Sequence, residues 1–551
     1  MSKKLPAQFQ HPYSFNPSFK KSVAYFSMEF AIDQALKTYS GGLGFLAGSH
    51  MRSVYEERQN VIGIGILWKF GYYDQVRSQT NEMDVLFREK FYYFLKDTGI
   101  RFQIDIHHTP VWVAAYFLPA ETFGTAPMFF LTTDTDGNDG LARSISYRLY
   151  DDNVSAKIAQ CILLGVGGAK LLDTMGYDPD VYHLNEAHAL SAAFYLYKKY
   201  KKVEEVRKRL VFTTHTPEEA GNEKHDINQL NILSFFAGVP LDEVRRITGM
   251  QDHVFNHSLA ALRLSRKANA VSKLHGEVSR QMWGGFSGIC EITHVTNAQN
   301  KTYWMDNELE RAHKVEDLEA IRERKKELKK QLFKVVADQT GKLFDPDVLT
   351  LVWARRFAGY KRADLLTWDT AAFDALVKNT KQPIQIIWAG KPYPKDYGAV
   401  DTFNRLVHLS FLYPNVSVLT GYELGLSKLL KDGSDLWLNT PVVTREASGT
   451  SGMTAAMNGS INFSTFDGWI CEFAKHGHNA FIVPPASHGA PAHERDAHDI
   501  QHFYEILNQE ILPLYYDQPN QWNHLVYRSM QDVIPFFDSS RMATEYYEKV
   551  Y

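Results

Sequence analysis

The sequence predicts an α/β protein built from two doubly wound parallel sheets. Short apolar runs of strand length recur between helix-length segments, and a charged segment separates them into two sets. Continuous apolar strands that alternate with helices are typical of parallel sheets covered on both faces. The chain has 551 residues, which is enough for two or more domains of about 150 to 250 residues each.

The predicted strands form two groups of five. The first group comprises residues 23–26, 61–64, 128–131, 181–184 and 210–213. The second group comprises residues 349–353, 384–388, 416–419, 436–438 and 480–483. Ligands of open α/β sheets bind beyond the carboxyl ends of the strands. Polar residues that directly follow these runs are therefore the candidate site residues.

The segment between the two groups, residues 314–342, predicts one long amphipathic helix. Its apolar residues recur at helical spacing: Leu318, Ile321, Leu328, Leu332, Val335 and Val336. Within it, residues 322–327 mix glutamates with arginines and lysines, so we interpret this run as a solvated helix face rather than a basic patch. We place the domain change just before this helix, which predicts domains of residues 1–295 and 296–551.

Composition excludes several classes of protein. The net charge is −3, without the basic excess of a dedicated nucleic-acid binder. Cys161, Cys290 and Cys471 are scattered, which favours buried thiols in a reducing compartment over disulfides or a zinc site. Residues 1–6 precede no apolar stretch typical of a signal peptide, and no run of about 18 apolar residues suggests a membrane span. We expect a soluble cytoplasmic protein that binds neither nucleic acid nor membrane.

A glycine-rich segment follows the first predicted strand. Gly41, Gly42 and Gly44 lie at the entrance to a predicted helix. Two interpretations remain open. The glycines either form a tight strand-to-helix turn, or they let backbone N–H groups approach an anion at the helix N-terminus.

Histidines and other polar residues follow two neighbouring predicted strands, in residues 183–188 and 213–219. His188 and His215 could bind a polar substrate or a zinc ion. No cysteine lies nearby and no third ligand stands out at a suitable spacing. We therefore favour hydrogen bonding and expect no metal site.

Four cations follow the strand at residues 349–353, namely Arg355, Arg356, Lys361 and Arg362. They must face a cleft or the surface, because burying unpaired charges is costly. A phosphate pocket and a salt-bridged rim both remain open, and Gly359 within the turn favours the pocket. Further along, small and hydroxyl residues at 447–452 precede a short predicted helix, with Glu446 as an acceptor at its mouth.

Five motifs, at residues 25–30, 40–44, 183–188, 355–362 and 446–459, together resemble the α-glucan (glycogen, starch and maltodextrin) phosphorylase family, in its compact bacterial branch. They occur in family order along nearly the whole chain. The resemblance implies a GT-B architecture, with two Rossmann-like domains facing across a cleft. It also implies reversible phosphorolysis of α-1,4-glucan (glycogen or maltodextrin) to glucose 1-phosphate with retention of configuration. Inorganic phosphate would be the co-substrate. Whether the protein forms a homo-oligomer stays open at this point.

The resemblance also implies roles for single residues. Gly42 and Leu43 would lie by the substrate phosphate, and His188 and Asn297 would bind the glucosyl unit. The residues that would hold its hydroxyls are Glu446, Ser448 and Gly449. The implied catalytic residues are His188, Arg356, Lys361 and Glu446, with Arg356 and Lys361 binding phosphates. The implied residues around the family's cofactor, pyridoxal 5′-phosphate, are Trp304, Arg355, Lys361, Gly449, Thr450 and Thr454.

One position departs from the family pattern. The family attaches pyridoxal phosphate through a lysine, where this chain has Thr454. A threonine hydroxyl cannot form a Schiff base. Three hypotheses follow: a phosphorylase with untethered or no pyridoxal phosphate, a nucleotide-sugar-dependent α-glucan synthase, and a non-catalytic glucan-binding protein. We favour the first, because the other phosphate and sugar positions are filled.

Overall fold

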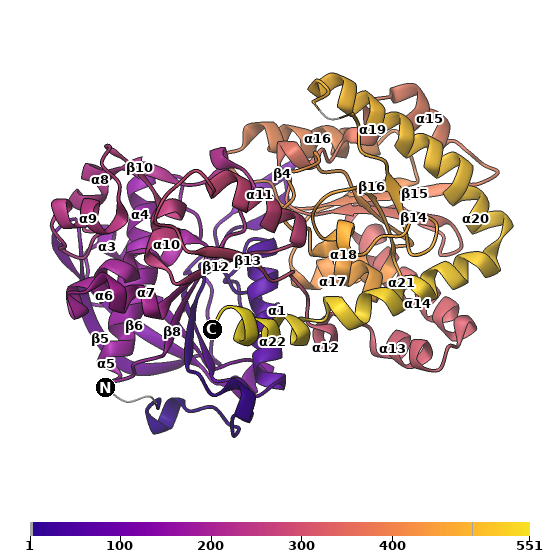
Figure 1. Ribbon diagram of the computed structural model, residues 1–551. Helices are drawn as coiled ribbons and strands as arrows, with labels where there is room; N and C mark the ends of the chain where they lie inside the picture. The colour runs from indigo at the N-terminus through magenta and orange to yellow at the C-terminus, as the bar shows by residue number, and fades with distance from the viewer. Residues whose placement is uncertain (1–3, 488) are drawn as a thin grey trace. The chain divides into compact units, whose positions relative to one another are not determined.

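The computed structural model describes residues 4–487 and 489–551, which fall into two compact units (Figure 1). Residues 1–3, part of the segment in which we predict no signal peptide, lie outside the described residues. Unit 1 comprises Met1–Tyr73, Phe87–Asn300 and Ser539–Tyr551. Unit 2 comprises Asp74–Leu86 and Lys301–Asp538.

The predicted domains of residues 1–295 and 296–551 differ from these units in two segments. The last helix, α22 (Ser539–Lys549), packs on α1 (Gly42–Glu56) in unit 1, where the hydroxyls of Ser53 and Ser539 are 2.6 Å apart. The hairpin of β3 (Asp74–Arg77) and β4 (Met83–Leu86) belongs to unit 2, where Gln75 Nε2 donates to Gly390 O at 2.9 Å. Such exchanges depend on tertiary packing, which local sequence patterns do not report.

Unit 1 contains a nine-stranded sheet of order β13-β12-β9-β8-β1-β2-β7-β6-β5. The first seven strands of this order are parallel to their neighbours, and β6 and β5 are antiparallel. Their bounds are β1 (Val23–Phe26), β2 (Val61–Ile66), β5 (Lys96–Ile106), β6 (Thr109–Leu118), β7 (Met128–Thr132), β8 (Val181–Asn185), β9 (Leu210–Thr213), β12 (Lys267–Ala270) and β13 (Glu291–His294). A separate two-stranded antiparallel sheet pairs β10 (Lys224–Asp226) with β11 (Val254–Asn256).

Helices cover this sheet. They are α1, α2 (Ala120–Phe123), α3 (Gly140–Ser144), α4 (Val154–Ile162), α5 (Gly168–Thr174), α6 (Ser191–Tyr200), α7 (Val203–Arg209), α8 (Ile227–Ile232), α9 (Leu241–Thr248), α10 (His257–Leu264), α11 (Lys273–Trp283) and α22. The continuous helix Val154–Thr174 is long and apolar enough to cross a membrane, but 72% of its most apolar window is buried inside the protein. That burial is typical of a core helix.

Unit 2 contains a six-stranded parallel sheet of order β16-β15-β14-β17-β18-β19. The strands are β14 (Leu349–Ala354), β15 (Ile384–Ala389), β16 (Val416–Leu419), β17 (Leu436–Asn439), β18 (Ile461–Thr465) and β19 (Ala480–Val483). The helices are α12 (Lys301–Trp304), α13 (Asn307–Lys314), α14 (Leu318–Thr340), α15 (Thr370–Val377), α16 (Tyr397–Ser410), α17 (Leu424–Gly433), α18 (Ser451–Met457), α19 (Ala492–Ile506), α20 (Leu512–Asp517) and α21 (Pro519–Phe537). All ten predicted strands are confirmed, and both sheets have the predicted doubly wound, mainly parallel character.

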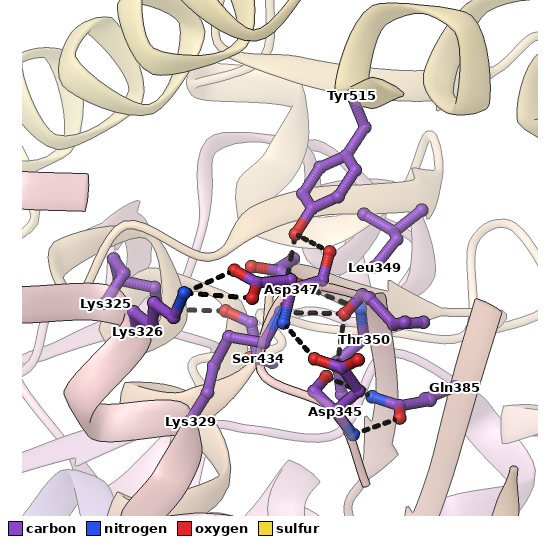
Figure 2. Close-up of polar contacts among 12 residues, drawn as sticks. Lys325, Lys326, Lys329, Asp345, Asp347, Leu349, Thr350, Gln385, Ser434 and Tyr515 are labelled. Atoms are coloured by element: carbon purple, nitrogen blue, oxygen red, sulfur yellow. Dashed lines mark hydrogen bonds and ion pairs between the residues drawn. The ribbon is translucent and has the colours of Figure 1, made fainter. Parts of the chain in front are cut away.

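The long charged helix is confirmed as α14, but the interpretation of its charged run as a solvated face is wrong for Lys325. This residue is 7% exposed. Its Nζ donates to the carbonyl oxygens of Asp432, Ser434 and Asn458 at 2.6, 2.9 and 2.8 Å. Figure 2 shows Lys325 with the neighbouring lysines of α14 and the polar groups at the start of β14. Three carbonyl acceptors compensate the buried ammonium, an arrangement that charge spacing alone does not predict.

Candidate active site

The predicted basic cluster and Glu446 come together at the carboxyl end of β14 in unit 2. Arg355 Nη2 and Lys361 Nζ each lie 2.8 Å from Glu446 Oε2. The side chains of Arg355 and Lys361 are each 8% exposed, and that of Glu446 is 11% exposed. Burial alone raises the pKa of Glu446, but the charges of Arg355 and Lys361 outweigh it and lower that pKa to about 2. Glu446 is therefore a carboxylate at neutral pH.

This cluster carries a surplus of positive charge. Two buried cations share one carboxylate, and the exposed Arg356 adds a third charge that also lowers the pKa of Glu446. Buried Arg355 Nε has no hydrogen-bond partner among the described residues. Arginine and lysine donors in such an arrangement suit a phosphate dianion.

The fourth cation, Arg362, has a structural role instead. It is 4% exposed and forms ion pairs with Asp496 and Asp499, both at 2.6 Å. Its Nε also donates to the carbonyl oxygen of Thr440 at 2.9 Å. The salt-bridged alternative from the sequence thus applies to Arg362, whereas Arg355 and Lys361 meet at Glu446.

The loop after Glu446 is fixed by its neighbours in unit 2. Glu446 N–H donates to Asp467 Oδ2 at 2.8 Å, and Trp469 N–H donates to Ser448 O at 2.8 Å. Gly449 has φ +86°, a left-handed conformation that glycine adopts without a steric penalty. Thr450 follows as the residue before α18. Burial and the nearby charge of Glu446 raise the pKa of Asp467 to about 7.

The residue that replaces the family's cofactor lysine lies inside unit 2. Thr454 is fully buried on α18, and its hydroxyl donates to Ser451 O at 3.0 Å. Asn458 Nδ2 donates to both Thr454 O and Trp304 O at 2.9 Å, so Trp304 and Thr454 are neighbours. The residues here do not fit a cofactor attached at residue 454, because position 454 offers no amine.

Another amine faces Trp304. Lys431, on α17, places its Nζ 3.7 Å from the centroid of the Trp304 ring, a cation–π distance. The side chain is 1% exposed, and this burial lowers the pKa of Lys431 well below its usual value. The space over this face of Trp304 is therefore occupied by a side chain of the protein.

We expect no stoichiometric pyridoxal adduct on this protein after incubation with pyridoxal phosphate and borohydride reduction. Thr454 cannot form the imine, and Lys431 is enclosed against Trp304. Peptide mass spectrometry would measure this, with Thr454→Lys as the comparison that restores an amine. A one-to-one adduct on a single lysine of the unsubstituted protein, Lys431 included, would show that the covalent anchor has moved rather than been lost.

In unit 1, the glycine-rich loop at the start of α1 is built around an internal carboxylate. Glu29 Oε2 accepts hydrogen bonds from Ser40 N at 2.6 Å and Gly41 N at 3.0 Å, and Glu29 Oε1 accepts one from the Ser40 hydroxyl at 3.0 Å. A Cβ on Gly44 would lie 2.6 Å from Tyr39 Cβ, so this glycine is needed for packing. The tight-turn interpretation therefore holds for this part of the loop.

Gly42 and Leu43, the residues implied to lie by a substrate phosphate, form the first turn of α1. A Cβ on Gly42 would meet no other atom within 4 Å. The backbone is thus open at Gly42, as an approaching ligand requires.

The histidines at the ends of β8 and β9 differ in their surroundings. His215 Nε2 is hydrogen-bonded to Asn185 Oδ1 at 2.7 Å, and burial lowers the pKa of His215 to about 3. His188 is half-buried, and its Nδ1 is a buried atom with no hydrogen-bond partner among the described residues. Glu186, two residues before His188, has φ +68°, backbone strain that often marks functional segments. His188 is therefore the histidine available to a ligand.

Two further predicted sugar-binding residues share this property. Asn297 Oδ1 in unit 1 and Ser448 Oγ in unit 2 are buried without a hydrogen-bond partner among the described residues. Buried polar atoms in native proteins are nearly always hydrogen-bonded. His188 and Asn297 in unit 1, and Ser448 in unit 2, each present an atom that a polar group could satisfy.

Sequence reasoning missed Asp467 and Lys431. Asp467 follows β18, a strand rich in Asn, Ser and Thr that the apolar pattern did not mark. Lys431 lies on an amphipathic helix, where a lysine normally indicates the solvated side. The Asp467-Gly468 pair just after β18 could have indicated Asp467. The local sequence around Lys431 carries no such signal.

Two units with parallel sheets and polar residues after the strands define a glycosyltransferase fold of the GT-B class. A family model described as "Carbohydrate phosphorylase" matches residues 295–509, and one described as "Starch synthase catalytic domain" matches residues 40–291. The chain belongs to the α-glucan phosphorylase family.

Individual relatives agree. Maltodextrin phosphorylase of Thermococcus litoralis is 30% identical, over 97% of this chain and 71% of its own length. Glycogen phosphorylase of Aquifex aeolicus is 29% identical, over 98% of this chain and 87% of its own. An uncharacterized protein of Methanocaldococcus jannaschii is 46% identical, over 96% of this chain and 100% of its own.

Proposed function

We propose that this protein is an α-glucan phosphorylase-type glucosyltransferase. It reversibly transfers the terminal glucosyl unit of an α-1,4-glucan, such as glycogen or maltodextrin, to inorganic phosphate, with retention of configuration. One observation carries the proposal. His188, Asn297 and Ser448, which the family resemblance assigns to the sugar, each have a buried polar atom without a hydrogen-bond partner among the described residues. Relatives named as glycogen and maltodextrin phosphorylases support it.

The chemistry of unit 2 fits the phosphate half of this reaction. Lys361, Arg355 and Arg356 supply positive charge that Glu446 only partly neutralises. Glu446 uses Oε2 for both ion pairs, and its Oε1 takes no hydrogen bond from the described residues. Oε1 would accept a sugar hydroxyl while the cations hold phosphate. The positioned charges would stabilise the transition state.

Unit 1 would supply the sugar half. His188 and Asn297 would hydrogen-bond glucosyl hydroxyls, and the backbone at Gly42 would approach the phosphate. Inorganic phosphate is the co-substrate in this account. No step is assigned to pyridoxal phosphate, because Thr454 does not fit its family attachment.

We expect Glu446→Gln to lower kcat/KM for glucose 1-phosphate. The decrease should correspond to a loss of about 2–4 kcal/mol of transition-state stabilisation. The change removes the charge that faces Arg355 and Lys361 and weakens a charged acceptor for the sugar. Steady-state kinetics in both directions would measure it, with Glu327→Gln on the exposed side of α14 as the control. Rates within twofold of the unsubstituted protein would remove Glu446 from the sugar site.

A three-substrate comparison tests the function itself. The protein is incubated with maltoheptaose and phosphate, with maltoheptaose and ADP-glucose or UDP-glucose, and with maltoheptaose alone. We expect α-glucose 1-phosphate in the first reaction only. Glucan binding without turnover in any reaction would favour the non-catalytic alternative.

The match of residues 40–291 to the starch synthase catalytic domain favours a second candidate, a nucleotide-sugar-dependent α-glucan synthase. In that case the cations at Glu446 would hold a diphosphate. Chain extension from a nucleotide sugar, together with no phosphate-dependent release of glucose 1-phosphate, would select this candidate.

A further inference from the structure

Glu223, His225 and His257 form a cluster at the β10–β11 strand pair of unit 1, with Glu223 just before β10 and His257 just after β11. One potential ligand atom from each residue lies within 4.8 Å of the others. Glu223 and His225 are two residues apart, so the strand directs both side chains to one face. The antiparallel register pairs His225 with Phe255, and His257 follows β11 beside Glu223, where His257 N–H donates to Glu223 O at 3.1 Å.

The two imidazole rings meet through ring nitrogens. His225 Nδ1 lies 2.9 Å from His257 Nε2. Two nitrogens bound to one zinc ion at about 2.0–2.1 Å would be separated by about 2.9 Å at a right angle and about 3.3 Å in a tetrahedral site. Shifts of a few tenths of an ångström at the two rings therefore suffice to admit an ion.

His257 is held in place by its surroundings. It is 2% exposed, begins α10, and packs its ring against Phe235 and Phe255, with centroids 5.1 and 5.2 Å away. This packing fixes the orientation of the ring that would hold the metal.

The third donor is a carboxylate. This donor is the exposed side chain of Glu223. Two imidazoles and one carboxylate are the donor set of three-ligand zinc sites that keep a fourth position open.

We propose that Glu223, His225 and His257 bind one divalent transition-metal ion of the Zn²⁺ type, with a fourth position left for water or another ligand. From the sequence we expected no metal site, because only His188 and His215 were candidate ligands. His225 and His257 are 32 residues apart and share no recognisable motif. Only the pairing of β10 with β11 brings them together.

Untagged protein, stripped with a chelator, is titrated with ZnCl₂ against a chromogenic chelator and with CoCl₂ by visible absorption. We expect one ion per chain and Co²⁺ bands typical of nitrogen and oxygen ligands. His225→Ala and Glu223→Gln should each weaken Zn²⁺ binding at least ~10-fold, and His225→Ala should abolish the Co²⁺ bands.

His253→Ala is the matched control, an exposed histidine just before β11 that lies outside the cluster. It should leave affinity and spectrum unchanged. Glu223 is exposed and His225 only partly buried. Glu223→Gln therefore tests the site while the contact between the rings of His225 and His257 is kept. Less than one ion per chain, or equal affinity in these two variants and the unsubstituted protein, would overturn the proposal and leave a hydrogen-bonded histidine pair. Because the readout is binding, the result does not depend on glucosyl transfer.

Discussion

Replacing Lys361 with alanine is expected to reduce glucosyl transfer to phosphate at least ~100-fold in kcat, the effect of losing a preorganised charge at a reacting group. The side chain of Lys361 is 8% exposed, and its Nζ lies 2.8 Å from Glu446 Oε2 at the carboxyl end of β14. Its removal leaves Arg355 and Arg356 to hold phosphate alone and changes the position of Glu446. Phosphorolysis at saturating glucan and phosphate would measure the loss.

Lys378→Ala is the matched control for this experiment. Lys378 is an exposed lysine of unit 2 that pairs with Asp374 one helical turn away. We expect activity within twofold of the unsubstituted protein and no change in circular dichroism for either variant. Full activity in Lys361→Ala would reduce Lys361 to a structural partner of Glu446 and remove the phosphate-pocket assignment.

Lys329→Met is expected to lower the free energy of unfolding by about 3–5 kcal/mol, the cost of leaving one partner of a buried ion pair uncompensated. Lys329 and Asp435 are 2% and 8% exposed at the side chain and 2.5 Å apart. Asp435 Oδ2 also accepts Thr350 N–H at 2.8 Å at the start of β14, and Lys329 Nζ donates to Val348 O at 2.8 Å. The variant would therefore leave an unpaired buried carboxylate at the start of β14, the strand that Arg355 follows.

Lys330→Met controls for the general effect of removing a lysine from α14. Lys330 is exposed and pairs with Glu327 on the same helix face, a type of pair that contributes about 0–1 kcal/mol. Urea unfolding followed by fluorescence would measure both variants. Equal midpoints for Lys329→Met and Lys330→Met would show that the Lys329–Asp435 pair contributes little to stability.

The sequence predicts the sheets well, because strands buried on both faces are apolar throughout. β1 and β14 are examples, with every residue buried. β12, β13 and β18 were missed because they carry Lys267, Glu291 or several small polar residues. β5 and β6 of the unit 1 sheet were also missed, and exposed residues alternate with buried ones along part of β5. The assignment of α22 to unit 1 depends on packing against α1, for which the local sequence carries no signal.

Three of the candidate residues could be named because they follow predicted strands, Arg355 directly and Lys361 and Glu446 after a short loop. The structure brings these three side chains together, and their roles in a site stay a prediction. Residues that act through tertiary contacts could not be found this way. Lys431 reaches Trp304 from another helix, and His257 reaches His225 across the β10–β11 strand pair.

The central proposal is phosphate-dependent glucosyl transfer by a chain with no lysine at position 454. It is tested most directly by exchange of radiolabelled inorganic phosphate into glucose 1-phosphate, with no pyridoxal phosphate added and with the absorbance spectrum of the protein recorded first. We predict exchange that requires a maltodextrin acceptor and is lost in Lys361→Ala. No exchange in the presence of maltodextrin, with or without added pyridoxal phosphate, would contradict the account.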